Sequence, residues 1–437
     1  MKTRKWSKIL LQRQSIRPTE KGQFGEVFTP VAIIDEMLAS LPSSVWSNPN
    51  LRWLDPACGL GNFPMRIIHG GQGYPGLYEG LRDVLPKDDD RRTHIVSMIT
   101  CYDINVESVK TFRGLLKQFS TGEATNVHVG DFLEADDSSL YDIVVGNPPY
   151  NSGGTKRLGE KRLHIRFAER ALSMLRKEGY LLFVCPPNYR QAGSVMNKLF
   201  LEKGAFSYLR ILGPEETHKV FGIQSRVDVF LFHVGGGKSR TRLIDEYGVS
   251  QSVHLDLSRH VPNFGHSIFE KLREGPRAEV TAFRTAEAST VGCKGFGRSG
   301  FPTVHLLVSG GRKLLRRRVA HTLQDVPKLL VNGLGVPYVL YDGAGVYGVT
   351  QVPLVVVRPS ADLVAFAGSP LFFFLVWALR LTGNNNLPYL FDDVPADFGR
   401  GLRLTAEERA LVDSFVVPMC ADRDIWISCD MSKTRKK

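Results

Sequence analysis

The first half of the sequence alternates apolar runs of strand length with helical patterns, and this alternation constrains the fold most strongly. The runs are Leu51–Cys58, His94–Asn105, Asn126–Phe132, Tyr141–Pro149, Gly179–Pro187, Phe206–Gly213 and Arg226–Val234. Before the fifth run, residues 163–179 place apolar side chains along one stripe and end at Gly179, which predicts a helix. Strands separated by helices form an open, mostly parallel sheet that is covered on both faces. We therefore predict an α/β fold.

Length and charge divide the chain and limit its partners. With 437 residues, 43% of them apolar, the chain is too long for one compact domain of ordinary size. We predict a first domain at 1–238, a second, mixed α+β domain at 239–430 and a basic tail at 431–437. The net charge of +12 favours a polyanionic partner without identifying it. Both halves are basic, so a nucleic acid would touch both.

Cysteine spacing and apolar runs point to a protein without a structural metal or a membrane span. The six cysteines form no Cys-x-x-Cys pair and no zinc-type pattern with histidine. We expect no metal site, a reducing compartment and hence a cytoplasmic location. The longest apolar run, Pro370–Leu379, is too short to span a bilayer and predicts a buried core helix that Arg380 closes.

A glycine-containing turn follows the first predicted strand. In "DPACGLGNF", Gly59 and Gly61 let the backbone turn tightly and approach a ligand, and the helix behind them would favour a carboxylate at its N-terminus. An ordinary strand-to-helix turn accounts for a lone Gly-x-Gly about as well. The preceding Asp-Pro-Ala-Cys favours the ligand-binding interpretation.

Acidic residues follow the next two strands at their carboxyl ends, where ligands bind in such sheets. Asp103 is suited to bridging two ribose hydroxyls. The long interval after Asp55 predicts an inserted surface segment at Gly70–Arg92. After the third strand, Asp131 can accept from an exocyclic amino group and Phe132 can cover an aromatic ring. One acid after a strand is usually a helix cap, but acids at successive strand ends favour a nucleotide-like ligand.

The fourth strand ends in Asn147-Pro148-Pro149-Tyr150. Two prolines fix φ at consecutive residues, so the Asn147 side chain and the Pro148 carbonyl are held in one region. Both are acceptors. Together they can take the two hydrogens of a planar NH2 group and push its lone pair out of conjugation, while Tyr150 stacks on the ring that bears the amine. A proline turn would explain the motif alone, but not its order after the glycine turn and the acids.

These segments resemble the successive motifs of gamma-type S-adenosylmethionine-dependent adenine-N6 DNA methyltransferases. The matching segments are Phe24–Pro30, Asp55–Phe63, Cys101–Asn105, Gly130–Glu134 and Asn147–Asn151. The resemblance covers about residues 22–236, and its Phe-Thr-Pro and Asn-Pro-Pro-Tyr elements are the most specific. It implies a Rossmann-like class I methyltransferase fold. It also implies methyl transfer from S-adenosyl-L-methionine to the N6 amino group of an adenine flipped out of a specific double-stranded DNA sequence, as in restriction-modification.

The resemblance also implies roles for individual residues. The residues implied to bind the cofactor are Phe28, Thr29, Pro30, Asp55, Ala57, Gly59, Gly61, Asp103, Asp131 and Phe132. The residues implied to hold the target base are Asn147, Pro148, Pro149 and Tyr150. Gamma enzymes offer the flipped base a second aromatic side chain, and the candidate here is Tyr189. We expect a monomer that acts on double-stranded DNA in a prokaryotic, phage or viral setting.

The second half has no catalytic pattern but suits nucleic-acid recognition. Basic and aromatic residues are interleaved in Cys293–Phe301, and arginines are concentrated in Gly311–Arg318, as a phosphate-tracking surface needs. A solvated helix face would explain the arginine run equally well. The polar loop within Leu381–Phe391 is placed to reach base edges. We expect this half to select the DNA target.

Other functions remain open from the sequence. N5-glutamine methyltransferases that act on release factors share the Asn-Pro-Pro-Tyr motif, because a side-chain amide presents the same planar NH2. They are shorter and have a small N-terminal helical domain in place of a long basic C-terminal one. An RNA N-methyltransferase is a third possibility. A nucleic-acid-binding module without enzymatic activity fits the charge but leaves Asn147–Tyr150 unexplained.

Overall fold

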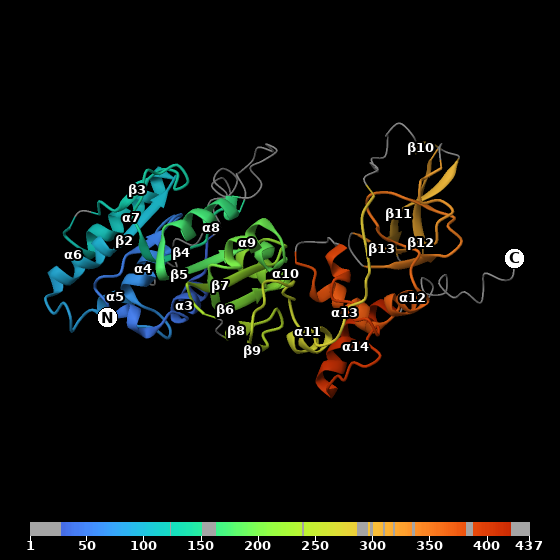
Figure 1. The fold of residues 1–437 in the computed structure, drawn as a ribbon. Helices are drawn as coiled ribbons and strands as arrows, with labels where there is room; N and C mark the ends of the chain where they lie inside the picture. The colour runs from blue at the N-terminus through green and yellow to red at the C-terminus, as the bar shows by residue number, and fades with distance from the viewer. Residues whose placement is uncertain are drawn as a thin grey trace. The chain divides into compact units, whose positions relative to one another are not determined.

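The computed structural model describes most of the chain between residues 28 and 420 (Figure 1). Not described within this span are residues 123, 151–162, 238–239, 286–295, 298–299, 309–310, 318–319, 334–336 and 382–387. The chain forms two compact units, Met1–Val261 and Pro262–Lys437. Each unit has its own core.

The first unit is built on a nine-stranded sheet of order β3-β2-β1-β4-β5-β7-β6-β8-β9. Five neighbouring strands are parallel: β3 (Val127–Val129), β2 (Ile99–Asp103), β1 (Trp53–Asp55), β4 (Tyr141–Gly146) and β5 (Leu175–Cys185). Four strands extend the sheet: β7 (Val227–Val234), β6 (Gly204–Leu212), β8 (Thr241–Ile244) and β9 (Ser250–Val253). Among these, β7 is antiparallel to β5 and β6, and β9 to β8. The predicted mostly parallel α/β fold is confirmed.

Strand order reverses beside β1, and this reversal locates a binding crevice. The chain runs outward from β1 to β2 and β3, then returns to the other side of β1 to form β4 and β5. The connections therefore leave β1 and β4 in opposite directions. In open α/β sheets, ligands bind at the carboxyl ends of the strands at such a switch point.

Helices cover both faces of this sheet because alternate strand residues point to opposite sides. One core cluster packs Trp53, Ile143 and Leu182 under helices that lie on one face. These are α3 (Val31–Ala39), α4 (Asn62–His69), α5 (Gly76–Gly80), α6 (Asp88–Met98) and α7 (Val106–Phe119), with η1 (Ser43–Trp46) beside them. The other cluster packs Leu54 and Val144 under the second face. That face carries α8 (Leu163–Ser173) and α9 (Val195–Phe200).

Two predicted element boundaries are corrected by the sheet. The helix predicted to end at Gly179 ends at Ser173, because Leu175 already pairs with Tyr141 of β4. A bulge follows, and a Cβ at Gly179 would lie 3.0 Å from the carbonyl oxygen of Asp142, so this glycine serves strand packing. The strand predicted from His94 begins at Ile99, since the preceding residues complete α6, whose first turn carries three aspartates.

The segment Gly70–Arg92, predicted as a surface insertion, is exposed over much of its length but also contributes side chains to the core. Tyr74, Leu77 and Leu81 are buried in the first core cluster. The Tyr74 hydroxyl donates a 3.0 Å hydrogen bond to Asp35 on α3. Asp35 also holds Arg66 of α4 in an ion pair of 2.6 Å. The segment thus braces α3 against α4, which lies directly behind the glycine turn.

The second unit is mixed α+β, as predicted. Its strands form two sheets: β10 (Phe296–Gly297), β12 (Gly311–Arg317), β11 (Phe301–Val308) and β15 (Gly348–Val349) in one, and β14 (Val339–Asp342), β13 (Lys328–Val331) and β16 (Leu354–Val357) in the other. Its helical elements are α11 (His266–Arg273), α12 (Ala361–Ala367), α13 (Pro370–Ala378), η3 (Pro388–Phe391) and α14 (Ala406–Cys420). The arginine-rich run therefore forms strand β12, which excludes the helix-face interpretation.

The apolar run at 370–379 forms the buried helix that we predicted. Helix α13 packs Phe372, Phe374 and Leu375 into the core of the second unit. Arg380 is buried directly after it, with its guanidinium 4.7 Å from the Trp377 ring centroid. No single described helix is long and apolar enough to cross a membrane; α12 and α13 reach that length only together, and they are bent by 68°.

The first unit extends beyond the boundary predicted at residue 238. Strands β8 and β9 follow that residue and complete the sheet, and the unit ends at Val261. Several predicted features lie outside the described residues. They are Phe24–Val27, most of Cys293–Phe301, Arg318, the asparagine loop at 382–387 and the basic tail. The assignment of the two units to catalysis and target recognition stays a prediction.

Candidate active site

The carboxyl ends of β1, β2 and β4 bring together the residues singled out in the sequence. Asp55 ends β1 beside Cys101 of β2, so Asp103 lies at the same edge of the sheet. Gly146 ends β4, and a Cβ there would lie 3.1 Å from Asp55 Oδ1. Asn147 therefore begins directly beside Asp55, across the switch point.

Asp55 is a buried carboxylate with one uncommitted oxygen. Oδ1 accepts a 3.1 Å hydrogen bond from the amide of Ala57. Oδ2 is buried and has no hydrogen-bond partner among the residues that the structure describes. Burial raises the Asp55 pKa well above its ordinary value, and the nearby charge of Asp103 adds to the increase. A buried acceptor without a donor marks a place for a ligand that donates hydrogen bonds.

The two glycines of the turn serve different purposes. Gly59 has φ of +50°, and a Cβ on it would meet nothing within 4 Å, so its backbone faces open space. Gly61 has φ of +85°, and a Cβ there would lie 2.1 Å from the Phe112 ring of α7. Gly59 therefore suits the predicted close approach to a ligand. The missing side chain of Gly61 lets α4 pack against α7, and its contact with the cofactor stays a prediction.

Asp103 fastens the glycine turn. Its Oδ2 accepts a 2.7 Å hydrogen bond from the amide of Gly59, and its Oδ1 accepts one of 2.8 Å from Asn105. Burial raises the Asp103 pKa, while these two hydrogen bonds act in the opposite direction. A carboxylate offers about four lone-pair sites, so these bonds leave capacity for hydroxyl donors. The predicted contact of Asp103 with a ribose is compatible with this geometry.

Asp131 and Phe132 lie at the end of β3 but not in the arrangement that we predicted. Phe132 is 1% exposed and packs against the rings of Tyr102 and Phe167, at centroid distances of 5.7 and 5.6 Å. The guanidinium of Arg170 lies 5.1 Å from its centroid. The expectation that this ring covers an adenine is corrected accordingly, because the ring fills the core. Asp131 is exposed, and its Oδ1 accepts from the amide of Leu133 at 2.8 Å.

The Phe-Thr-Pro and Asn-Pro-Pro-Tyr segments meet, although they are 118 residues apart. The Asn147 Nδ2 donates a 3.1 Å hydrogen bond to the hydroxyl of Thr29, which is buried. Pro30 then caps the N-terminus of α3, while Phe28 is half-buried. Sequence reasoning placed Thr29 with the cofactor and missed this contact. Thr29 therefore contributes to the orientation of the Asn147 carboxamide.

Tyr150 is held by the first residues of α8. His164 Nδ1 lies 3.3 Å from the Tyr150 carbonyl oxygen, and its ring meets the tyrosine ring edge-on at 6.3 Å. Pro148 is buried and Pro149 half-buried, so the motif is packed along its length. Burial raises the Tyr150 pKa well above its ordinary value, with smaller contributions from Cys185 and Asp228. The motif is a rigid platform at the end of β4.

The candidate for a second aromatic side chain is corrected by its burial. Tyr189 lies in η2 (Pro187–Arg190) after β5 and is 0% exposed. Its ring stacks on Phe206 at 5.1 Å and meets Phe230 edge-on at 5.2 Å. A side chain enclosed in this way cannot receive a base. The run "CPPNYR" gave no indication of which side of the loop faces the core.

A family model covers part of this site. The model of the Eco57I restriction-modification methylase family matches residues 92–220, which include β2, β4 and the Asn-Pro-Pro-Tyr motif. Among curated proteins, no sequence matches this chain. Among the described residues, no three or more His, Cys, Asp or Glu side chains are grouped so that they could hold a metal ion.

Similar solved structures come from restriction-modification enzymes. The type IIL enzyme MmeI, solved in complex with DNA, is 10% identical, with a TM-score of 0.47 over 93% of this chain and 73% of that chain. The ATP-dependent type ISP enzyme LlaBIII, bound to DNA, is 11% identical, with a TM-score of 0.47 over 76% and 33%. A type I methyltransferase subunit from Streptococcus thermophilus is 16% identical, with a TM-score of 0.36 over 53% and 50%. The chain thus spans about half the length of the type I modification subunits that it resembles.

Proposed function

We propose that this protein transfers a methyl group from S-adenosyl-L-methionine to the N6 amino group of an adenine flipped out of double-stranded DNA, in a restriction-modification setting. The observation that carries the proposal is the Asn147 carboxamide, oriented by Thr29 and followed by two prolines, beside the buried carboxylate of Asp55. The match of residues 92–220 to a restriction-modification methylase family supports it.

The residues at the ends of β1 and β2 fit S-adenosyl-L-methionine. The orphaned Asp55 Oδ2 suits the ammonium group at the methionine end, and the open space over Gly59 admits a ligand close to the backbone. Asp103 would take the ribose hydroxyls, and the exposed Asp131 would take the adenine amino group. The bound cofactor supplies an electrophilic methyl group.

The chain's own contribution to the reaction is to position the amine. The Asn147 side-chain oxygen and the Pro148 carbonyl oxygen would each accept one N–H of the target NH2 group. Two acceptors outside the ring plane draw the nitrogen toward a tetrahedral shape, so its lone pair leaves the aromatic system and points at the methyl donor. Preorganised acceptors of this kind cost no rearrangement at the moment of reaction. Tyr150 would stack on the extruded ring.

The second unit favours DNA over a protein or a small substrate. Arg312, Leu314 and Arg316 alternate along β12 and are exposed, so they lie on one side of the strand. The two arginines are four residues apart, or roughly 13 Å along a strand. Such a row suits a phosphate backbone. A methyltransferase that acts on protein glutamine would not need such a row of arginines. The row would suit RNA as well as DNA, so the experiment below distinguishes these two substrates.

The direct test is methyl transfer from labelled cofactor to unmethylated genomic DNA, followed by nucleoside analysis. We expect the label in N6-methyladenine. N4-methylcytosine as the sole product would overturn the choice of base. Label that appears in RNA or in protein glutamine, with none in DNA, would establish one of the alternative substrates.

Asp55→Asn should weaken cofactor binding and yet stabilise the ligand-free protein at neutral pH. Burial raises the Asp55 pKa, so the folded protein holds this proton more tightly than the unfolded chain does. The free energy of unfolding therefore falls as pH rises above the ordinary carboxyl range. Asparagine cannot ionise, and it keeps an oxygen for the Ala57 amide. We expect a binding loss of about 1–3 kcal/mol, the range for hydrogen bonds to charged groups.

Thermal melting from acidic to neutral pH, with and without cofactor, checks this prediction. Asp136→Asn is the matched control, because Asp136 is an exposed acid close to β4. The control should melt with the pH dependence of the wild type. An Asp55→Asn variant that does the same would show that this carboxylate is not strained by burial.

Arg312→Ala combined with Arg316→Ala should weaken DNA binding on all sequences alike. Phosphate contacts position a protein and release counterions, so each lost contact should flatten the log–log salt dependence by up to roughly one unit. Arg400→Ala with Arg403→Ala removes the same charge from other exposed positions of this unit and should leave the slope unchanged. The measurement is the DNA affinity of each double variant as a function of salt concentration. Equal slopes for both double variants would remove β12 from the DNA-binding surface.

A further inference from the structure

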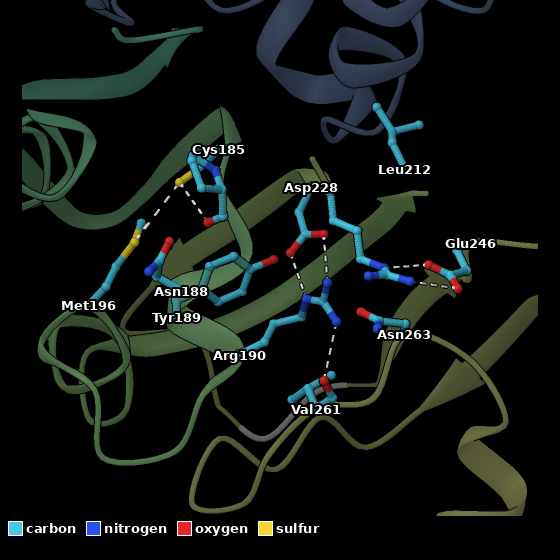
Figure 2. Close-up of polar contacts among 12 residues, drawn as sticks. Cys185, Asn188, Tyr189, Arg190, Met196, Leu212, Asp228, Glu246, Val261 and Asn263 are labelled. Atoms are coloured by element: carbon cyan, nitrogen blue, oxygen red, sulfur yellow. Dashed lines mark hydrogen bonds and ion pairs between the residues drawn. The ribbon is translucent and has the colours of Figure 1, made fainter. Parts of the chain in front are cut away.

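A completely buried ion pair lies at the same edge of the sheet and has no part in the reaction described above. Arg190 and Asp228 are both 0% exposed (Figure 2). Arg190 Nε donates to Asp228 Oδ2 at 2.7 Å and Nη2 donates to Oδ1 at 3.1 Å, so the guanidinium holds both carboxylate oxygens. Arg190 ends η2 after β5, and Asp228 lies near the start of β7.

One end of the pair lies on the same edge of the sheet as the platform proposed for the target base, with β5 between them. Gly146, the residue before Asn147, pairs with Phe183 of β5. Two residues further along β5, Cys185 pairs with Asp228. Asp228 is therefore one strand beyond β5 at the carboxyl edge where Asn147 emerges. The Asp228 charge also acts on Tyr150. Burial makes the largest contribution to the raised pKa of Tyr150, and Cys185 and Asp228 make smaller ones.

The other end of the pair holds the last residues of the first unit. Arg190 Nη1 donates to the carbonyl oxygen of Val261 at 3.2 Å, and the Val261 amide donates to the Arg190 carbonyl at 2.9 Å. Figure 2 shows Arg190 between Asp228 and Val261. Pro262 begins the second unit directly after this contact.

Neighbouring residues reinforce the same attachment. The Ala192 amide donates to His260 Nδ1 at 3.1 Å. Asn197 Nδ2 donates to the carbonyl oxygens of Leu257 at 3.0 Å and Tyr189 at 2.8 Å. The loop after β5 and helix α9 are thus fastened to residues 257–261 by three side chains among the described residues, and Arg190 also bonds to Asp228 in the sheet.

Stability alone is a poor reason for such a pair. Removing two charges from water is expensive, and apolar residues of similar volume often serve as well or better in the same place. Beside Arg190 in the chain, Tyr189 packs against the rings of Phe206 and Phe230, so apolar side chains are at hand in this part of the core. What apolar side chains cannot supply is a bond of fixed direction to both a strand and a backbone carbonyl.

We propose that Arg190 and Asp228 are positioning residues that tie the target-base platform to the segment 257–261, so that the chain leaves the first unit at a fixed place relative to Asn147. The effect that we expect on catalysis rests on the function proposed above. The attachment itself is a property of the folded chain and has its own readout.

A second buried pair on the same edge provides a matched control. Arg226 Nε donates to Glu246 Oε2 at 2.6 Å, and the side chains are 6% and 5% exposed. This pair joins the start of β7 to the turn between β8 and β9. It is nearly as buried, and Arg226 lies two residues from Asp228. If the Arg190–Asp228 pair only stabilised the fold, replacing either pair should have the same effect on kcat.

The test compares two apolar double variants of the full chain, Arg190→Met with Asp228→Leu, and Arg226→Met with Glu246→Leu. We expect both to fold and to bind S-adenosyl-L-methionine as the wild type does. The first should lower kcat about 100-fold at unchanged KM for the cofactor, the size of effect that misplacement by about 1 Å produces. It should also speed hydrogen exchange of the Val261 amide. The second double variant should change neither kcat nor the exchange rate of the Val261 amide.

Each outcome decides the proposal. Unchanged kcat and unchanged protection of Val261 in the first variant would overturn it, as would equal losses in both variants. If the first variant does not fold, Arg190→Lys replaces it, because lysine keeps the charge but lacks the fork that reaches both Asp228 and Val261; kcat and Val261 protection at wild-type levels in that variant would also overturn the proposal. A wild-type protein that methylates no DNA would refute the proposed function, while Val261 exchange would still test the attachment.

Discussion

Asn147→Ala should reduce methyl transfer by about two to three orders of magnitude, the range seen when one preorganised hydrogen-bonding group is removed from a reaction centre. Alanine deletes one of the two acceptors proposed for the target amine, so the lone pair would stay in conjugation. Affinity for S-adenosyl-L-methionine should change little, because Asp55, Gly59 and Asp103 are fastened by their own contacts. Single-turnover kinetics and calorimetry measure the two effects separately.

Thr29 offers a graded control for this experiment. Its hydroxyl accepts from Asn147 Nδ2 at 3.1 Å, so Thr29→Val keeps the shape of the side chain and removes this hydrogen bond from the carboxamide. We expect a loss intermediate between the wild type and Asn147→Ala, and Thr29→Ser should recover most of the rate. Full activity in Asn147→Ala would refute the proposed mechanism. A Thr29→Val variant with normal kcat but weakened cofactor binding would return Thr29 to the role first inferred from the sequence.

The sheet and the edge at which the site lies could be predicted from the sequence, because both produce patterns among residues that are close together in the chain. A parallel strand buried on two faces is a continuous apolar run, and the residues that break the run fall at its end. Asp55, Asp103 and Asn147 each follow such a run. The order of the strands, and hence the meeting of these three residues, follows from the rules for α/β sheets.

What the sequence could not supply are orientation and long-range contacts. Phe132 and Tyr189 are aromatic residues in short loops, where no periodicity tells which side faces the core. The bond between Thr29 and Asn147 joins segments that are 118 residues apart. Strand β8 begins inside "GGGKSRTR" (Gly235–Arg242), where local composition contains no information about pairing with β6.

Asp228 lies between the features that the sequence predicts and those that it does not. An acid inside "RVDVFLFHV" is a visible anomaly, since a charged side chain in a buried strand needs a partner. Its partner Arg190 lies 38 residues away in a loop, and only the antiparallel placement of β7 beside β5 brings the two together. The anomaly could be found from the sequence, but the attachment to Val261 could not.

A fragment that ends at Val261 should bind S-adenosyl-L-methionine as the full chain does and lose its preference for a DNA sequence. All residues proposed to hold the cofactor lie upstream, and the fragment keeps the whole nine-stranded sheet. If the second unit reads the target, affinity should fall to the level of non-specific binding, typically 10³-fold or more below the specific level. Calorimetry with the cofactor, and DNA binding at one fixed salt concentration, measure both.

A fragment that ends at residue 238 should behave differently, and the difference tests the fold itself. It lacks β8, which pairs with Tyr208, Leu209 and Arg210 of β6, and so leaves a long apolar strand as an open edge. It also lacks residues 257–261, to which the loop after β5 is fastened. We expect this shorter fragment to aggregate, or to melt well below the one that ends at Val261. Equal melting of the two would show that β8 and β9 are dispensable, whereas methylation of the full chain's sites by the longer fragment would place target recognition in the first unit.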